Sequence, residues 1–464
     1  MELKSKNMRI SKNPCVLLRT EVRSLSGFLD VQDSPRTSVR GSSRILASEK
    51  EGAVSANLFS NSARFILKKL NGAELNKKEI YSIINDIVKN SLSEPEIAYF
   101  VSAVYKNGMS LEETINLTEA IASTGRILKW KDKLIADKHS IGGIPGNRTT
   151  PIVVSICAAA GIKMPKTSSR AITSAAGTAD VIETLADVSL SPERLKKVVE
   201  KTNACLSWGG SLGMAPADDK LIRVERLLNL DPEPQLIASI LAKKIAAGSR
   251  NILIDIPYGE NAKVSFKGAE NLKKKFIKVG NHFKLKLKVV LTDGSQPIGN
   301  GVGPVLEMQD VLKVLKQEAP PKDLESKSIF LASQILEMTG KAKKGEGRKK
   351  ARYLLNSGLA FKKFNEIVVA QGRTNNALKT ARFKYEVKSK SKGIVTSLNN
   401  KSINYLARIL GCPTAPSAGV YLNKHKKDKV NNKETLLVLY SESKKKLYEG
   451  IKFFNEEKPI TIKE

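Results

Sequence analysis

Two apolar runs that end in glycine most constrain the fold of this 464-residue chain. The segments NILIDIPYG at 251–259 and LKLKVVLTDG at 285–294 are rich in leucine and β-branched residues and alternate with helical stretches. A continuous apolar run of this length is typical of a strand that is buried on both faces of a sheet. The pattern therefore predicts an α/β layer architecture for the middle of the chain.

Other patterns along the chain predict further domains, as its length requires. Residues 1–57 mix short apolar runs with Ser, Gly and Arg, which favours a small N-terminal β domain. Apolar residues three and four apart, as in EIYSIINDIVKN, predict a helical domain at 58–130 with a returning segment at about 212–247. A large α/β domain with a mixed sheet is assigned to 131–211 and 248–345. Short strands such as GIVTSL predict a C-terminal α+β domain at 346–464.

The charge balance bears on the partners of the protein. Lys and Arg outnumber Asp and Glu by 78 to 46, a net charge of +32, and such a surplus attracts polyanions. Aromatic residues make up only 5% of the chain, and no basic segment is interleaved with the aromatics that stack single-stranded bases. A specific nucleic-acid partner is not expected. The surplus either assists a phosphate-bearing substrate or reflects lysine-rich solvated faces.

The cysteines and the hydropathy of the chain indicate where in the cell the protein is located. The four cysteines are scattered without a CxxC pair, so neither a zinc knuckle nor a disulfide framework is predicted. The polar N-terminus lacks an apolar core, and the apolar run 151–162 is much shorter than the roughly 20 residues of a membrane span. We expect a cytoplasmic protein without a membrane partner.

A glycine-rich loop follows at 137–150, DKHSIGGIPGNRTT, and runs into the helix-like PIVVSICAAAG. Such a loop can direct several backbone N–H groups at one anion, and the helix N-terminus adds positive potential. Glycine is needed because a Cβ would block close approach of the backbone. The spacing is not that of a nucleoside triphosphate loop. An ordinary surface turn between a strand and a helix is the alternative.

A second segment of this kind, KTSSRAITSAAGTADVIE at 166–183, adds several hydroxyl side chains and an arginine. Hydroxyl and guanidinium groups can bind phosphate by hydrogen bonds. A helix-capping loop is the alternative use of such residues. Two segments of this kind in close succession indicate a phosphate-handling site over 138–183.

These residues resemble those of a known family. The run 168–183, SSRAITSAAGTADVIE, is similar at each position to the signature of thymidine and pyrimidine-nucleoside phosphorylases. KHSIGG at 138–143, DPEPQLIASILAKK at 231–244 and TDGSQPIGNGVGPVLE at 292–307 resemble further blocks of that family. PGNRTT and PADDKLIRVER resemble its AMP phosphorylase type and the bacterial relatives that are often labelled thymidine phosphorylases.

The resemblance implies phosphorolysis of an N-glycosidic bond, with inorganic phosphate as co-substrate and neither a cofactor nor a metal. It also implies a homodimer or a larger homo-oligomer.

The resemblance also implies roles for particular residues. The phosphate-binding positions are Lys138, Ser140, Ser168, Thr178 and Thr150, with Thr149 as the alternative to Thr150. Asp231 matches the proposed proton donor. The positions expected to contact the nucleotide or nucleoside are Gly143, Ser169, Arg170, Ala171, Ile172, Thr173, Ser174, Thr178, Ser239, Lys243 and Lys263.

Elementary chemistry agrees with these roles. Phosphorolysis passes through an oxocarbenium-like sugar, so a fixed phosphate beside C1′ both stabilises that charge and supplies the nucleophile. A purine leaves more easily when protonated at N7, which Asp231 could do, although Asp before Pro is also a common helix N-cap. A pyrimidine leaves as a stabilised anion and needs a cation or donor such as Lys243 or His139. His139 either acts as an acid or orients Ser140.

Three functions are compared. The first is an AMP phosphorylase that also accepts CMP or UMP and forms ribose 1,5-bisphosphate. The second is a thymidine phosphorylase. Lys263 and the loop around Arg170 favour the AMP phosphorylase, because a 5′-phosphate needs such cations. A non-catalytic nucleic-acid-binding relative is disfavoured because the phosphate-site residues are all present.

Overall fold

The computed structural model describes residues 61–132, 134–171, 174–374 and 377–463. The N-terminal β domain predicted at 1–57 therefore lies outside the described residues, as do Ile172 and Thr173. No helix in the described part of the chain is long and apolar enough to cross a membrane.

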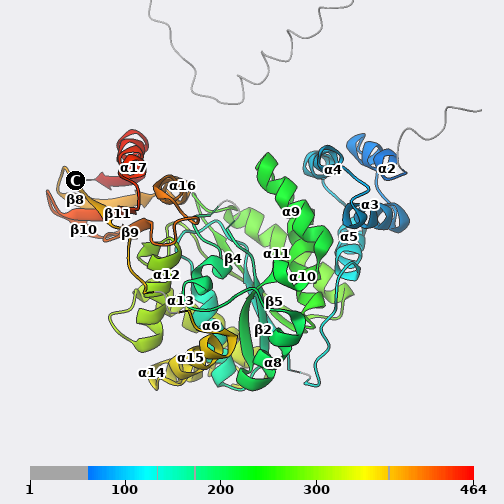
Figure 1. The fold of residues 1–464 in the computed structure, drawn as a ribbon, viewed down its shortest axis with the longest axis horizontal. Helices are drawn as coiled ribbons and strands as arrows, with labels where there is room; N and C mark the ends of the chain where they lie inside the picture. The colour runs from blue at the N-terminus through cyan, green and yellow to red at the C-terminus, as the bar shows by residue number, and fades with distance from the viewer. Residues whose placement is uncertain (1–60, 133, 172–173, 375–376, 464) are drawn as a thin grey trace, which may run out of the picture. The chain divides into compact units, whose positions relative to one another are not determined.

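Helices that come from two stretches of the sequence form a bundle. Ile80, Ile83, Ile84 and Ile87 line one buried face of a single helix at spacings of three and four, as the sequence pattern predicts. Capping boxes at Asn76, Ser93 and Ser110 begin three of the helices. The bundle comprises α2 (Asn61–Leu70), α3 (Lys77–Lys89), α4 (Glu94–Asn107), α5 (Leu111–Ser123), α9 (Pro216–Leu228) and α10 (Glu233–Ala246), and the last two pack beside α4 and α5 (Figure 1).

Parallel strands form the centre of the α/β domain. One sheet has the order β1-β4-β5 with β1 (Ala136–Ser140), β4 (Asn251–Tyr258) and β5 (Lys286–Asp293), and β2 (Met164–Ser168) pairs with β3 (Ala204–Trp208). A parallel bridge from Ile135 to Lys163 links the two groups of strands. The antiparallel pairing in this region is made by β6 (Gly301–Val302) with β9 (Gly419–Leu422).

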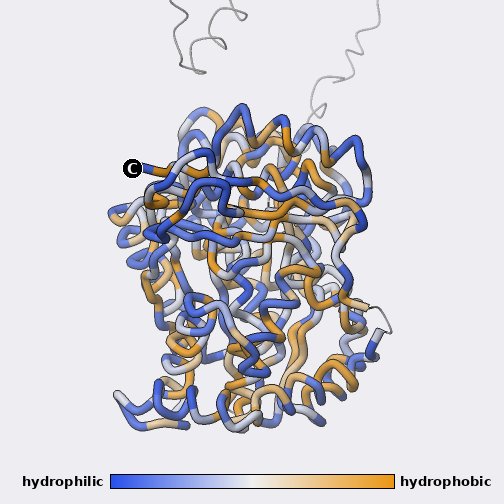
Figure 2. The backbone as a smooth tube through the Cα atoms, turned by 90° about the vertical axis from the view of Figure 1, so that its left-hand side faces the viewer, coloured by the Kyte–Doolittle hydropathy of each residue, from blue (hydrophilic) through white to orange (hydrophobic). Residues whose placement is uncertain are grey.

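Strand β4 is buried on both faces, which confirms the expectation from its apolar run. The same expectation is wrong for β5, which lies at the edge of the sheet and is only partly buried. Ile252, Ile254 and Ile256 pack with α10 and with α11 (Phe266–His282), whereas Leu253 points to the opposite layer of α6 (Thr149–Ala159) and α13 (Lys322–Met338). This alternation follows from the two-residue period of a strand. Along the backbone, short hydrophobic and hydrophilic stretches follow one another, as expected for elements with one buried face (Figure 2).

The helices that complete this layer extend beyond the boundary predicted at residue 346. Ala351, Leu354 and Leu355 in α14 (Gly347–Asn356) and Phe364 in α15 (Leu359–Gln371) belong to the same core as α6 and α13. The basic stretch 341–352 thus enters α14. The boundary differs because those apolar residues recur at helical spacing and need the α/β core to bury them. Further helices of the layer are α7 (Thr178–Glu183), α8 (Pro192–Thr202) and α12 (Pro304–Lys316).

The C-terminal α+β domain follows α15. Its two sheets have the orders β6-β9-β11-β7 and β10-β8-β12, so β6 joins it to the α/β domain. Its elements are β7 (Phe383–Lys388), β8 (Gly393–Leu398), α16 (Asn400–Leu410), β9, β10 (Lys429–Val430), β11 (Thr435–Ser441), α17 (Lys444–Glu457) and β12 (Ile460–Lys463). The expected combination of a helical domain, a large α/β domain and a C-terminal α+β domain is confirmed.

Candidate active site

The two predicted phosphate segments meet at one edge of the parallel strands. β1 ends at Ser140 and β2 ends at Ser168, and the two strands run side by side in the same direction. α6 then begins at Thr149 and α7 at Thr178. Ligands of α/β proteins bind at this carboxyl edge, where helix N-termini offer backbone N–H groups to an anion.

Lys138 is the most buried cation of this edge. Its Nζ lies 2.6 Å from Thr149 Oγ1 and 3.3 Å from Thr150 Oγ1, and the side chain is fully buried. The structure thus brings Lys138 to both of the threonines between which the sequence could not choose. An ammonium group and two hydroxyl groups stand together at the start of α6.

Burial lowers the pKa of Lys138 to about 7, although the nearby Asp255 carboxylate acts in the opposite direction. The lysine is therefore largely neutral at pH 8. A phosphate dianion in contact with it would favour the ammonium form and restore the proton.

We expect phosphate binding at pH 8 to be accompanied by the uptake of close to one proton. Titration calorimetry in two buffers of different ionisation enthalpy measures this uptake. The KM for phosphate should also rise up to about tenfold between pH 8 and pH 9, because the free enzyme must be protonated in order to bind. Lys138→Met should remove the uptake, and an unchanged uptake in that variant would assign the proton to another group.

Arg148 was not among the predicted site residues, yet it joins the two segments. Its guanidinium donates to Thr178 Oγ1 at 2.7 Å, to the Ala176 carbonyl at 3.0 Å and to Glu307 Oε2 at 2.6 Å. Arg148 belongs to the motif PGNRTT, but the neighbouring residues in the sequence do not reveal its partners, which lie far along the chain. Thr178, a predicted phosphate ligand, is therefore held in place by an arginine.

Asp255 anchors the other predicted ligand, Ser140. The Ser140 hydroxyl donates to Asp255 Oδ2 at 2.6 Å, Thr292 donates to Oδ1 at 2.6 Å, and Lys327 forms an ion pair at 3.3 Å. Burial alone would raise the pKa of Asp255, but Lys327 and Lys138 lower it below its ordinary value. The signal for Asp255 was a carboxylate inside the apolar run NILIDIPYG. Ser168 Oγ, in contrast, is buried without a hydrogen-bond partner among the described residues.

The loop after β2 is held together by Asp180. Its carboxylate accepts the N–H groups of Ala171 at 2.7 Å and Gly177 at 2.8 Å. Arg170, expected to contact substrate, pairs with Glu183 at 2.5 Å and lies 5.0 Å from the centre of the Trp208 ring. Asp180 therefore holds the described residues on both sides of positions 172 and 173, and Arg170 is already engaged with carboxylates. The remaining predicted members, Ser169 and Ser174, lie on the same loop, and Ser174 donates to the Ala176 carbonyl at 3.0 Å.

A second group of predicted residues lies on the helical bundle. Ser239 and Lys243, one turn apart on α10, both contact Asp218 on α9. Asp218 Oδ2 accepts from Ser239 Oγ at 3.1 Å and pairs with Lys243 Nζ at 2.5 Å, and this aspartate is fully buried. Asp218 was overlooked although PADDKLIRVER was noted, because the motif itself does not reveal which of its two aspartates faces α10.

Asp231 and Lys263 form an ion pair across the site. Lys263 follows β4, and a Cβ on Gly143 would lie 3.1 Å from the Lys263 Cβ, so the glycine loop approaches this lysine closely. Gly143 itself has φ +88°, a conformation that favours glycine. The alternative role of Asp231 as a helix N-cap is wrong, since α10 begins after Pro232 without a side-chain cap.

His139 does not orient Ser140 through a hydrogen bond among the described residues. Ser140 is oriented by Asp255, and the described residues include no hydrogen bond from the His139 ring to it. Burial lowers the pKa of His139 well below its ordinary value, and the surrounding lysines lower it further. A neutral imidazole at physiological pH is a poor general acid.

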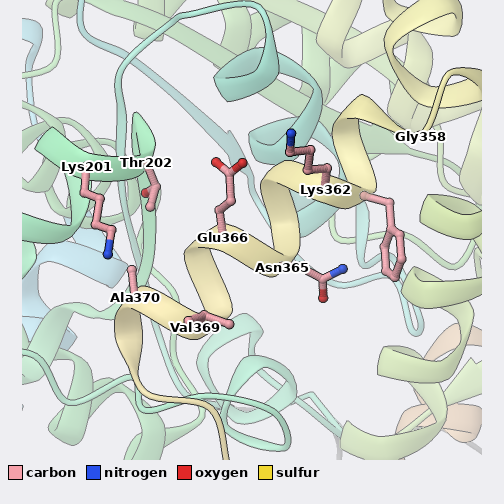
Figure 3. A pocket seen from close by; sticks show the side chains of 9 residues that line it. Lys201, Thr202, Gly358, Lys362, Asn365, Glu366, Val369 and Ala370 are labelled. Atoms are coloured by element: carbon pink, nitrogen blue, oxygen red, sulfur yellow. The ribbon is translucent and has the colours of Figure 1, made fainter.

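Of two hollows among the described residues, one adjoins this region and the other lies at the end of α8, next to the beginning of β3. One of about 290 Å³ is lined by Thr292 and Lys327, the residues that contact Asp255. The other, about 700 Å³, lies between the end of α8 and α15, where Lys201, Lys362 and Glu366 border it (Figure 3). That larger hollow contains none of the predicted site residues. In the described part of the chain, no group of three or more metal-ligating side chains could hold a metal ion.

Comparison with known proteins assigns the class. The model described as "Glycosyl transferase family, a/b domain" matches residues 132–361, and the helical bundle domain of the same family matches residues 63–125. The pyrimidine nucleoside phosphorylase C-terminal domain matches residues 394–461. The protein is thus an enzyme of the glycosyltransferase class, built from a helical bundle, an α/β domain and this C-terminal domain.

Individual relatives narrow the assignment. The chain is 42% identical to AMP phosphorylase of Methanococcus aeolicus, covering 86% of this chain and 81% of that protein. It is 44% identical to a putative thymidine phosphorylase of Legionella pneumophila, with coverage of 86% and 78%. The chain belongs to the nucleoside phosphorylase family that these proteins represent, which confirms the resemblance seen in its motifs.

A solved structure supports the fold alone. Anthranilate phosphoribosyltransferase of Thermus thermophilus superimposes with a TM-score of 0.56 at 18% identity. The match covers 66% of this chain and 99% of that structure.

Proposed function

We propose that this pentosyltransferase catalyses the phosphorolysis of nucleotides, with AMP as the preferred substrate and CMP and UMP as further substrates. The products are the free base and ribose 1,5-bisphosphate. The observation that carries the proposal is the presence of two separate cationic positions. Lys138 and Arg148 stand at the strand edge, and Lys263 stands over the Gly143 turn on the side of Asp231.

Inorganic phosphate acts as the nucleophile at the first position. Lys138, Thr150, Ser140, Ser168 and Thr178 hold it, with Thr149 beside them. One phosphate oxygen forms a bond to C1′ while the C1′–N bond breaks and its electron pair passes to the base. Hydrogen-bond donors that are already fixed in place stabilise the charges that develop and need no rearrangement. The buried, unpartnered Ser168 Oγ supports this assignment, since buried hydroxyl groups normally have partners.

The base and the 5′ end of the substrate occupy the other side. Ser239 and Lys243 contact the base, and the loop 169–174 and Gly143 line the nucleotide. Lys263 binds the 5′-phosphate. Asp231 is the proposed proton donor, and because it is paired with Lys263, it must first lose that partner. A 5′-phosphate would draw Lys263 away from Asp231. Binding of the substrate would therefore break the ion pair and leave the Asp231 carboxyl group free.

Thymidine phosphorolysis is the second candidate function. It is favoured by the relatives named putative thymidine phosphorylase and by Lys243, a cation that suits a pyrimidine anion. Phosphorolysis assays with AMP, CMP, UMP, thymidine and uridine distinguish the two. Turnover of thymidine without turnover of any nucleotide would reject the AMP proposal.

Lys263→Ala tests the 5′-phosphate position. We expect kcat/KM for AMP to fall by about 100-fold, the loss of one charge-assisted contact, while adenosine or thymidine turnover changes by less than about threefold. Lys275→Ala is the matched control, since Lys275 forms an exposed ion pair with Glu233. An equal loss for nucleotide and nucleoside would contradict the assignment.

The assembly and the compartment are also proposals. We infer a homodimer formed through the helical bundle, because Leu67, Tyr99 and Tyr105 are 57%, 60% and 59% exposed on α2 and α4. Light scattering should report twice the mass of the chain.

A cytoplasmic location is supported by Cys157, Cys205 and Cys412, which are buried free thiols.

A further inference from the structure

Four carboxyl groups and two lysines are gathered where α9, α10 and the loop after β4 meet, and one of the four, Asp219, is exposed to solvent. Asp218 pairs with Lys243, and Asp231 pairs with Lys263. Glu225 has no side-chain hydrogen bond or ion pair within the described residues. The two lysines are thus paired with two aspartates, and Glu225 is the partly buried carboxyl group that has no such partner.

The backbone places Glu225 within this group. It follows Asp218 by seven residues on α9, which is close to two helical turns, so both side chains leave the same face of the helix. At the end of α9 the chain folds back, and the Leu230 N–H donates to the Glu225 carbonyl at 3.0 Å. Asp231 follows this turn and is near enough for its charge to act on Glu225. The Glu225 side chain is half-buried, so a ligand can still reach it.

This environment favours the protonated acid. Burial raises the pKa of Glu225 to about 8, and the negative charges of Asp218 and Asp231 raise it further, while Lys243 and Lys263 act in the opposite direction. At neutral pH most of the Glu225 carboxyl groups carry a proton. A neutral carboxylic acid can donate a hydrogen bond or transfer its proton, and a general acid is most effective near the working pH.

We propose that Glu225 contacts the base of the bound nucleotide and supplies the proton to a leaving purine. The inference rests on the proposed function and assigns the proton transfer to N7 to Glu225 in place of Asp231. As the C1′–N9 bond breaks, its electron pair passes into the purine ring, and the Glu225 proton moves to N7. The base leaves neutral, phosphate is bonded to C1′, and the Glu225 carboxylate regains a proton from water. Unlike Asp231, Glu225 need not first lose a lysine partner.

Glu225→Gln is the principal test, because the amide keeps the volume and a hydrogen-bond donor but has no acidic proton. We expect kcat for AMP to fall by about 100-fold with KM nearly unchanged, within the range of general acid catalysis. Turnover of UMP should fall less than about tenfold, because a pyrimidine leaves as a stabilised anion. A purely structural role would reduce both substrates alike. Glu233→Gln, an exposed carboxylate at the start of α10, is the matched control.

Glu225→Leu, combined with 7-deaza-AMP, tests the contact to N7 directly. That analogue carries carbon in place of N7, so its inhibition constant should be the same for wild type and Glu225→Leu. Binding of AMP without phosphate should weaken about tenfold in the same variant, the loss of one hydrogen bond. Circular dichroism and thermal unfolding verify that each variant is folded.

The outcomes separate the two proposals. A wild-type enzyme that leaves AMP unchanged contradicts the proposed function. Wild-type turnover of AMP that survives Glu225→Gln contradicts only the role of Glu225. Equal losses for AMP and UMP, or a 7-deaza-AMP affinity that falls with Glu225→Leu, also overturn that role.

Discussion

Lys138→Ala is expected to lower kcat/KM for phosphate by at least about 10³-fold, the upper range for removing one fixed charge-stabilising donor. Lys138 Nζ is fully buried and lies within 2.6 Å and 3.3 Å of the two threonine hydroxyls at the start of α6. Its loss would remove the cation that we propose faces the phosphate, and water in a buried site cannot replace it. Initial rates at saturating nucleotide and varied phosphate measure the effect.

The fold should survive this substitution. Burial already disfavours the charged lysine, as its lowered pKa indicates, so removal of the amine relieves a desolvation cost. Lys138→Met fills the volume that alanine leaves empty and should be equally inactive with an unchanged far-UV spectrum. Lys344→Ala, at an exposed position, should retain wild-type rates. A Lys138 variant within tenfold of wild type would contradict the phosphate assignment.

Arg148→Met is expected to destabilise the protein by about 3–5 kcal/mol, as when one partner of a buried ion pair is removed. Its partner Glu307 is 1% exposed and would be left without a cation, and Thr178 and the Ala176 carbonyl would lose their donor. Burial already raises the pKa of Glu307. Because the folded state then binds a proton more readily, the loss of stability should be smaller at pH 5 than at pH 8.

Urea unfolding followed by circular dichroism measures this change. The double variant Arg148→Met with Glu307→Leu removes both charges, and we expect it to recover most of the stability but none of the activity, because Thr178 remains without its donor. Arg194→Met, at an exposed ion pair with Asp187, should cost less than about 1 kcal/mol. If Arg148→Met lowers the free energy of unfolding no more than Arg194→Met does, the buried ion pair contributes little to stability.

Much of the site could be predicted because its signals are local. The glycines at 142 and 143 have positive φ angles, and the hydroxyl residues lie at strand ends and helix starts, so short motifs reveal them. The motif resemblance then supplied Ser239, Lys243 and Lys263, which have no local signal of their own. Their positions relative to the bound substrate remain predictions.

The residues that were missed share a different property. Asp255, Arg148 and Asp218 each act through partners that are distant in the sequence, such as Ser140 or Glu307. No pattern in a single stretch of sequence encodes such a pair. The role of Asp231 shows the same limitation, since Asp before Pro suggested a cap, whereas the actual partner is Lys263 from another domain.

By itself, the sequence of this protein determined the buried strand β4, the helical periods and the two loops at the strand ends, because each depends on residues close together along the chain. Tertiary structure alone decided that α14 and α15 join the α/β core and that two lysines are paired with aspartates while Glu225 is not. Burial and charge pairing set which carboxyl group keeps its proton, and both depend on neighbours that only folding brings together.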